Sequence, residues 1–180
     1  MDEGFRAVLE QVLWAWDAVG DALANPLIAV GVVVGAVVLG VGARCAARRF
    51  GWRPVPAVFA GVFLGVVLGV TFSRTLPDWA TAPGQAFCHL NGFSLHGSAE
   101  LLNALLFVPL VWCAVLATRR PLAVAVGAVL LSAAIEVVQP LTGRGLCETQ
   151  DLFNNSAGAV VAAALAAGFV ALRDRAEVAR

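Results

Sequence analysis

Long runs of apolar residues separated by short charged segments dominate this sequence. Each run is close to the 20 or so residues that a helix needs to cross the hydrocarbon core of a bilayer. Glycine and alanine are frequent within the runs, as in helices that pack closely in lipid. The pattern predicts an all-α membrane protein, a bundle of five transmembrane helices at residues 22–43, 54–73, 100–118, 121–139 and 152–172.

Residues 1–21 have a different pattern. Apolar residues recur there at helical spacing, namely Phe5, Val8, Leu9, Val12, Trp16 and Val19. Charged residues occupy the other side, namely Arg6, Glu10, Asp17 and Asp21. This periodicity predicts an amphipathic helix, which either lies in the membrane interface or caps the bundle. We therefore divide the chain into this helix and a transmembrane domain, residues 22–180.

Composition and charge support the membrane assignment and orient the chain. The 180 residues are 60% hydrophobic and 13% charged, against about a quarter charged in soluble domains. Nine arginines follow the first, third and fifth runs, and three lie on the alternate side, namely Arg6, Arg74 and Arg144. Because short loops rich in arginine stay in the cytoplasm, we expect the amino terminus outside and the carboxyl terminus in the cytoplasm.

The scarce polar residues gather at the predicted outer ends of the last three runs. Helical spacing places Ser132, Glu136 and Gln139 on one stripe, and it places Asp151, Asn155 and Gly158 on another. An acidic group at membrane depth is a candidate functional residue.

Glu136 is the sharpest candidate in this group, and we expect Arg144 to be its counter-ion, with Arg74 as a second possibility. The alternative is purely structural. The polar groups then bond to one another and fix the packing of the helices, with Asp151 capping the last one.

The order of these residues resembles the VanZ-like family of bacterial integral membrane proteins. The resemblance covers roughly residues 85–170 and rests on "NALLFVPL", "EVVQ", Arg144 and "DLFNNSAG". It implies a multi-pass protein of the bacterial cytoplasmic membrane. Founding members of the family are linked to low-level resistance to the glycopeptide antibiotic teicoplanin. The polar positions of the family fall on Asn103, Glu136, Gln139, Arg144, Asp151, Asn155 and Gly158, and a further acid falls on Glu148 in a loop one residue longer than the family pattern.

Two of the four cysteines are candidates for a disulfide. Cys88 and Cys147 fall in outer loops of the predicted topology, in a compartment where disulfides persist. The alternative is two free thiols. We expect no metal site, because His89 and His96 lack the paired spacing of zinc ligands.

Three function classes remain open. The first is an envelope protein that binds a lipid-linked cell-wall intermediate or an amphiphilic antibiotic, with Arg144 engaging a phosphate or carboxylate. The second is an enzyme acting on such a lipid, with Glu136 or Asp151 as acid or base. The third is a scaffold without a ligand. We expect membrane lipids as partners, and neither a cofactor nor a nucleic acid.

Overall fold

The described part of the chain is almost entirely helical. A computed structural model describes residues 3–73, 87–95 and 98–179. Within them the helices are α1 (Glu3–Ala24), α2 (Pro26–Phe50), α3 (Pro54–Phe72), α4 (Ser98–Leu106), α5 (Val108–Thr118), α6 (Pro121–Thr142) and α7 (Thr149–Val178). Two short strands, β1 (Cys88–His89) and β2 (Cys147–Glu148), pair in parallel.

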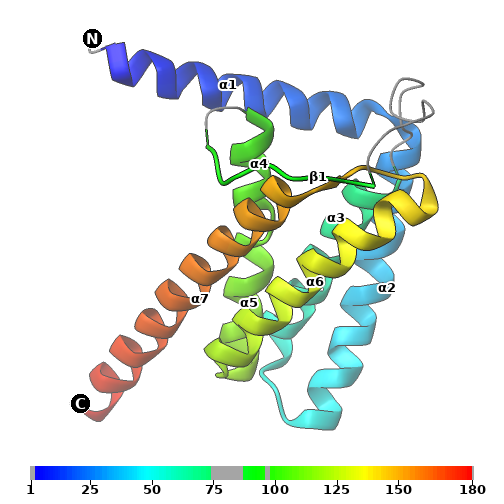
Figure 1. The fold of residues 1–180 in the computed structure, drawn as a ribbon. Helices are drawn as coiled ribbons and strands as arrows, with labels where there is room; N and C mark the ends of the chain where they lie inside the picture. Colours follow the sequence, from blue (N-terminus) through cyan, green and yellow to red (C-terminus); the bar gives the residue numbers. More distant parts are fainter. Residues whose placement is uncertain (1–2, 74–86, 96–97, 180) are drawn as a thin grey trace.

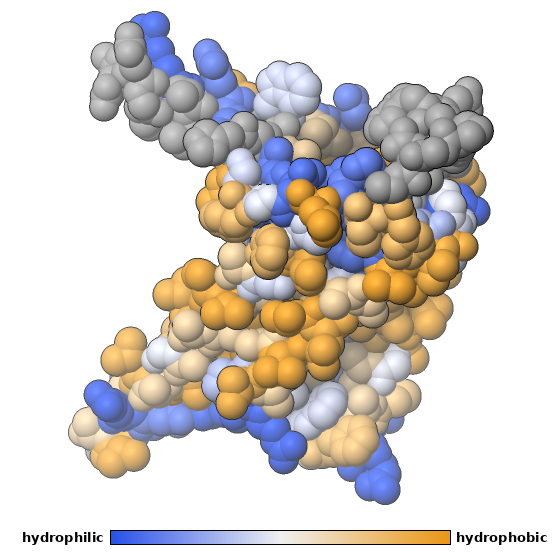
Figure 2. Space-filling view, viewed as in Figure 1, coloured by the Kyte–Doolittle hydropathy of each residue, from blue (hydrophilic) through white to orange (hydrophobic). Residues whose placement is uncertain are grey.

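Among the described residues, five segments are long and apolar enough to cross a membrane, which agrees with the predicted number of spans. They are α2, α3, α4 together with α5, α6 and α7. The space-filling view shows an apolar band over these helices with hydrophilic residues gathered toward its two ends (Figure 2). The protein therefore has the architecture of a multi-pass membrane protein.

Two helix boundaries differ from the sequence expectation because of local chemistry. The first span begins at Pro26 rather than at residue 22, since the Asn25 side chain accepts a hydrogen bond from the backbone N–H of Leu27 at 3.0 Å and caps α2. The fourth span continues through Pro140 to Thr142 and ends where Gly143 adopts a left-handed conformation. Glycine is the usual residue at such a helix end.

A proline also divides the third span. Pro109 has no N–H to donate to the preceding turn, and α4 and α5 meet at Phe107 just before it. The Phe107 side chain is fully buried and packs in the core with Val111, Val115 and Ala159. The break therefore lies at the centre of the packing among α3, α5, α6 and α7.

Helices α2 and α3 pack backbone against backbone. A Cβ atom added to Gly35 would lie 2.8 Å from the Gly65 carbonyl oxygen, and one added to Gly69 would lie 2.6 Å from the Cα atom of Val32. Small residues at such crossings let membrane helices approach closely. The other side of α2 carries a row of exposed valines, namely Val30, Val33, Val34, Val37, Val38 and Val41.

Helix α1 lies across one end of the bundle, above α4 (Figure 1). It is joined to α2 at the Asn25 cap, and the Gln11 side chain donates a hydrogen bond to the Leu95 carbonyl at 3.4 Å. The strands lie at this same end, whereas the connection between α5 and α6 and the carboxyl terminus lie at the other (Figure 1). The predicted place of α1 in the membrane interface stays a prediction.

Candidate functional site

The two strands join segments that are far apart in the sequence. Cys88 of β1 is the register partner of Cys147 of β2, and a disulfide links them with a Cα–Cα distance of 4.5 Å. This distance lies within the usual disulfide range, and the predicted disulfide is confirmed. We call residues 88–89 and 147–148 the strand clasp.

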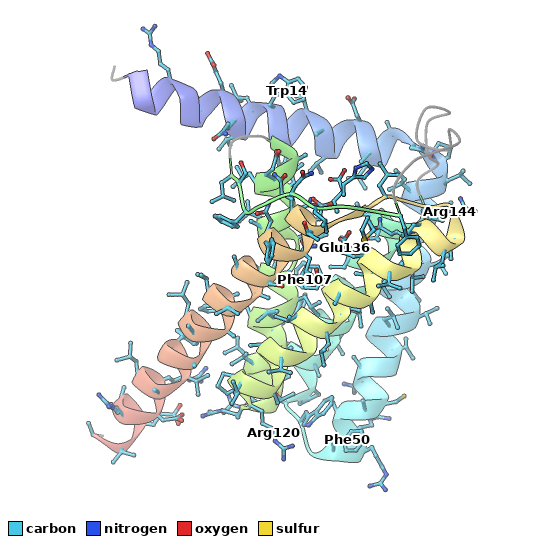
Figure 3. The ribbon with its side chains drawn as sticks, viewed as in Figure 1. Trp14, Phe50, Phe107, Arg120, Glu136 and Arg144 are labelled. Atoms are coloured by element: carbon cyan, nitrogen blue, oxygen red, sulfur yellow. A yellow bond between two sulfur atoms is a disulfide. The ribbon has the colours of Figure 1, made fainter. Side chains whose placement is uncertain are left out.

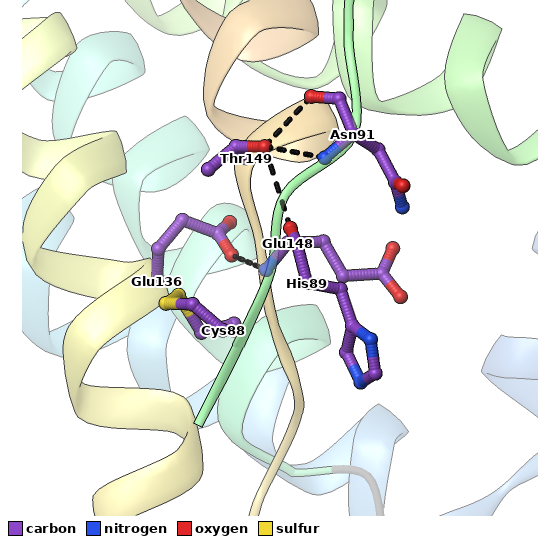
Figure 4. Close-up of a disulfide and its surroundings, with 7 residues drawn as sticks. Cys88, His89, Asn91, Glu136, Glu148 and Thr149 are labelled. Atoms are coloured by element: carbon purple, nitrogen blue, oxygen red, sulfur yellow. Dashed lines mark hydrogen bonds between the residues drawn. A yellow bond between two sulfur atoms is a disulfide. The ribbon is translucent and has the colours of Figure 1, made fainter. Parts of the chain in front are cut away.

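Thr149, the first residue of α7, secures the strand clasp from the other side (Figure 4). Its hydroxyl accepts the backbone N–H of Asn91 at 2.8 Å and donates toward the Asn91 carbonyl at 2.7 Å, with the His89 carbonyl at 3.3 Å. No local pattern in the sequence predicts this role, because the partners of Thr149 lie 58 and 60 residues away.

Glu136 ties the strand clasp to α6. Its side chain is 5% exposed, and the carboxylate accepts a hydrogen bond from the backbone N–H of Glu148 at 2.9 Å (Figure 4). Hydrogen bonds to an ionised carboxylate are about twice as strong as neutral ones. Glu136 therefore fixes the backbone at Glu148.

The expected ion pair between Glu136 and Arg144 is not formed. Arg144 is exposed beyond the end of α6, away from Glu136 (Figure 3). The ion pairs among the described residues are Arg119–Asp174 and Arg173–Glu177. Because α6 continues to Thr142, about 9 Å of helix separates Glu136 from its end. The second expected partner, Arg74, lies outside the described residues.

Asp151 does not cap the last helix as the structural alternative expected. The helix begins at Thr149, so Glu148 occupies the N-cap position and Asp151 lies within the first turn. A carboxylate there is favourable because the amino-terminal end of a helix carries a partial positive charge. Asp151 remains close to the strand clasp.

The predicted stripe on α6 faces α7 in the interior. Ser132 and Gln139 are buried together with Glu136, and the Asn155 side-chain amide donates to the Ser132 hydroxyl at 3.2 Å. Gln139 packs against Gly145, where a Cβ atom would lie 2.6 Å from the Gln139 side-chain carbonyl carbon. These contacts support the expectation that some of the polar residues at the ends of the last three spans fix how the helices pack.

The first turns of α7 also attach to α4. The Gln150 side chain donates to the Glu100 carboxylate at 3.3 Å, and the Asn154 side chain donates to the Glu100 carbonyl at 3.5 Å. One turn further, Gly158 lies against the backbone of Ala104, where a Cβ atom would overlap the carbonyl oxygen. Glycine at position 158 is therefore required by the closeness of the two helices.

A cavity of about 690 Å³ lies beside this junction. Its walls come from α1 to α5, from β2 with the segment that leads into it, and from the first turn of α7, and most of its lining is apolar. Among the described residues, the polar side chains that line it belong to Asn103, Glu148 and Asp151. Volume and lining are typical of sites for small molecules, which are mostly apolar with a few placed polar groups.

The structure thus divides the seven predicted site residues into three groups. Asn103, Glu148 and Asp151 line the cavity. Three members, Glu136, Gln139 and Asn155, are buried in the helix packing. Arg144 is on the surface. The sequence missed the contribution of α1 to the cavity, which comes from Ala18, Val19, Ala22 and Leu23.

Fold and site together define a multi-pass helical membrane protein with a polar junction and a cavity at one end of the bundle. The VanZ/LLP1 family model matches residues 62–171, which is more than half of the chain. The protein therefore belongs to the VanZ/LLP1 family. No curated protein and no solved structure gives a match.

Proposed function

We propose that this protein binds an amphiphilic molecule at the outer leaflet of the bacterial cytoplasmic membrane, in the cavity beneath α1. The observation that supports this most directly is the apolar cavity of about 690 Å³ with Asn103, Glu148 and Asp151 in its lining. An apolar chain fits the wall, and the three side chains offer hydrogen bonds to a head group. Lipid-linked cell-wall intermediates and amphiphilic glycopeptides such as teicoplanin belong to this class.

The distribution of arginines supports an outer location for the cavity. Arg48 and Arg49 lie in the last turn of α2, and Arg119 and Arg120 connect α5 to α6. These segments are at the end of the bundle opposite the strand clasp (Figure 1). Because arginine-rich loops stay in the cytoplasm, the cavity then faces the outer leaflet.

Labelling of one introduced cysteine at a time, with the Cys88–Cys147 disulfide kept, tests this orientation. In a background with Cys45 and Cys113 replaced by serine, Arg144→Cys is expected to react with a membrane-impermeant reagent in whole cells. Arg48→Cys is expected to react only after the membrane is opened. Labelling of position 48 from outside would refute the orientation.

Exposed apolar side chains on α1 support its placement in the membrane interface. Val12 is 51% exposed and Trp16 is 77% exposed, and Trp14 on the same helix is exposed as well (Figure 3). A helix that merely capped the bundle would bury these side chains. Aromatic residues are favoured at the level of the lipid head groups.

The geometry gives the two other function classes less support. Glu136 does not line the cavity and already accepts the Glu148 N–H, so Asp151 alone of the two expected acid–base residues reaches this space. A scaffold without a ligand leaves the cavity unexplained.

Filling the cavity tests the proposed function. Leu102→Trp places a larger side chain in the lining, and Leu122→Trp is the matched control on the exposed surface of α6. We expect the wild type and the control to retain a lipid during purification, detected by native mass spectrometry, and Leu102→Trp to lose it. Cells that rely on the protein for teicoplanin tolerance should lose that tolerance with Leu102→Trp alone. A folded Leu102→Trp protein with unchanged bound lipid would refute the proposal.

A further inference from the structure

The charge of the cavity lining points to the head group of the ligand. We propose that the cavity selects an amphiphile whose head group carries a positively charged amine, and that the Glu148 carboxylate binds this amine. The inference rests on the proposed function and narrows its ligands by charge, since it disfavours a head group whose only charge is a phosphate.

Apolar contacts alone cannot select a ligand in this setting. An acyl chain that moves from the bilayer into an apolar cavity exchanges one hydrocarbon environment for another and gains little from the hydrophobic effect. Discrimination among amphiphiles therefore depends on the polar residues of the lining, which in the described part of the chain are Asn103, Glu148 and Asp151. No arginine, lysine or histidine is among the described residues of the lining.

Of these three polar residues, Glu148 is the one whose carboxylate can accept a ligand's charge. Its side chain is half-buried, and it forms no hydrogen bond or ion pair with another described residue. An unpaired carboxylate beside apolar surface is costly unless an opposite charge approaches it. An ammonium group provides that charge together with hydrogen-bond donors, whereas a phosphate would be repelled.

Three contacts fix the backbone at Glu148. Its N–H donates a hydrogen bond to Glu136, Glu148 is the register partner of His89 in the strand clasp, and the preceding residue, Cys147, forms the disulfide. The side chain leaves the strand on the side away from Glu136 (Figure 4). A binding group on such a support loses little freedom when a ligand arrives, which favours affinity and selectivity.

Three probes with the same tail and different head groups test the proposal. We would measure binding of n-dodecylamine, n-dodecanol and n-dodecyl phosphate to the full-length protein in a nonionic detergent at neutral pH, by native mass spectrometry. Leu102→Trp gives the background from binding outside the cavity. The amine is expected to bind at least about tenfold more tightly than the alcohol, as for a hydrogen bond between charged groups. The phosphate is expected to bind most weakly.

Variants at position 148 test whether the Glu148 carboxylate causes the expected order of binding among the three probes. Glu148→Gln should bring amine binding down to that of the alcohol, and Glu148→Asp should retain the preference for the amine. Glu10→Gln removes the same charge from an exposed position on α1 and should change nothing. Even if Glu148→Gln fails to accumulate, the relative binding of the three probes to the wild type shows whether the cavity prefers an amine head group.

The outcomes separate the two proposals. Equal binding of all three probes above background, or tightest binding of the phosphate, would overturn the head-group assignment and leave the cavity as a binding site. The same holds if Glu148→Gln keeps the preference for the amine. Binding of every probe at the level of Leu102→Trp would overturn both proposals.

Discussion

Gly158→Ala tests the closest approach between α4 and α7. A Cβ atom at this position would overlap the Ala104 carbonyl oxygen and lie 2.8 Å from the carbonyl carbon, closer than the 3.0 Å below which real Cβ contacts essentially do not occur. A backbone carbonyl cannot rotate aside, so α4 must move. Overpacking costs about 1–3 kcal/mol, and we expect the upper end. The gain in helix propensity from glycine to alanine, about 0.5–1 kcal/mol, offsets only part of it.

The expected net loss of about 2 kcal/mol corresponds to a decrease of about 4–8 °C in melting temperature for a chain of this size. Gly168→Ala is the matched control, since nothing lies within 4 Å of an added Cβ atom at that position on the same helix. It should melt at or slightly above the wild-type temperature. Melting in detergent can be followed by size-exclusion chromatography after heating. If both variants melt at the wild-type temperature, the described contact between α4 and α7 is wrong.

The strand clasp and its supports give three further predictions. Thr149→Val should destabilise the protein by about 0.5–1.5 kcal/mol, because it removes the hydrogen bonds to the exposed backbone of Asn91; Thr149→Ser should melt near the wild type. Without reductant two of the four cysteines should be alkylated, as counted by mass spectrometry, and four alkylated residues would contradict the disulfide. Glu136→Leu should lower the melting temperature, since the Glu148 N–H loses its acceptor, and adding Arg144→Gln should not restore it.

Hydropathy predicted the number of spans well because the requirement for an apolar length is independent of tertiary structure. Charge alternation and the cysteines on one predicted face led to the Cys88–Cys147 disulfide, which is confirmed. The helix ends were harder to predict. Asn25 ends α1 and begins α2 within a run that hydropathy treats as one, and Pro140 lies inside α6, just beyond the predicted end of the span at residue 139.

The site was only partly accessible to sequence reasoning. Spacing on a helix predicted that Ser132, Glu136 and Gln139 share a face, and all three are buried. The counter-ion for Glu136 could not be chosen correctly, because the path of the chain after Gly143 decides where Arg144 lies. The cavity depends on how α1 folds back over α4, and no local pattern encodes such a distant contact.

The disulfide also gives the chain a covalent topology that the helices alone do not have. Because it joins Cys88 to Cys147, it closes a ring that contains α4, α5 and α6, and it leaves α1–α3 and α7 as two tails outside that ring. A protease cut in the α5–α6 connection, between Arg119 and Arg120, would open the ring without separating the pieces. The nicked protein should run as one band on a gel without reductant and as two bands with it.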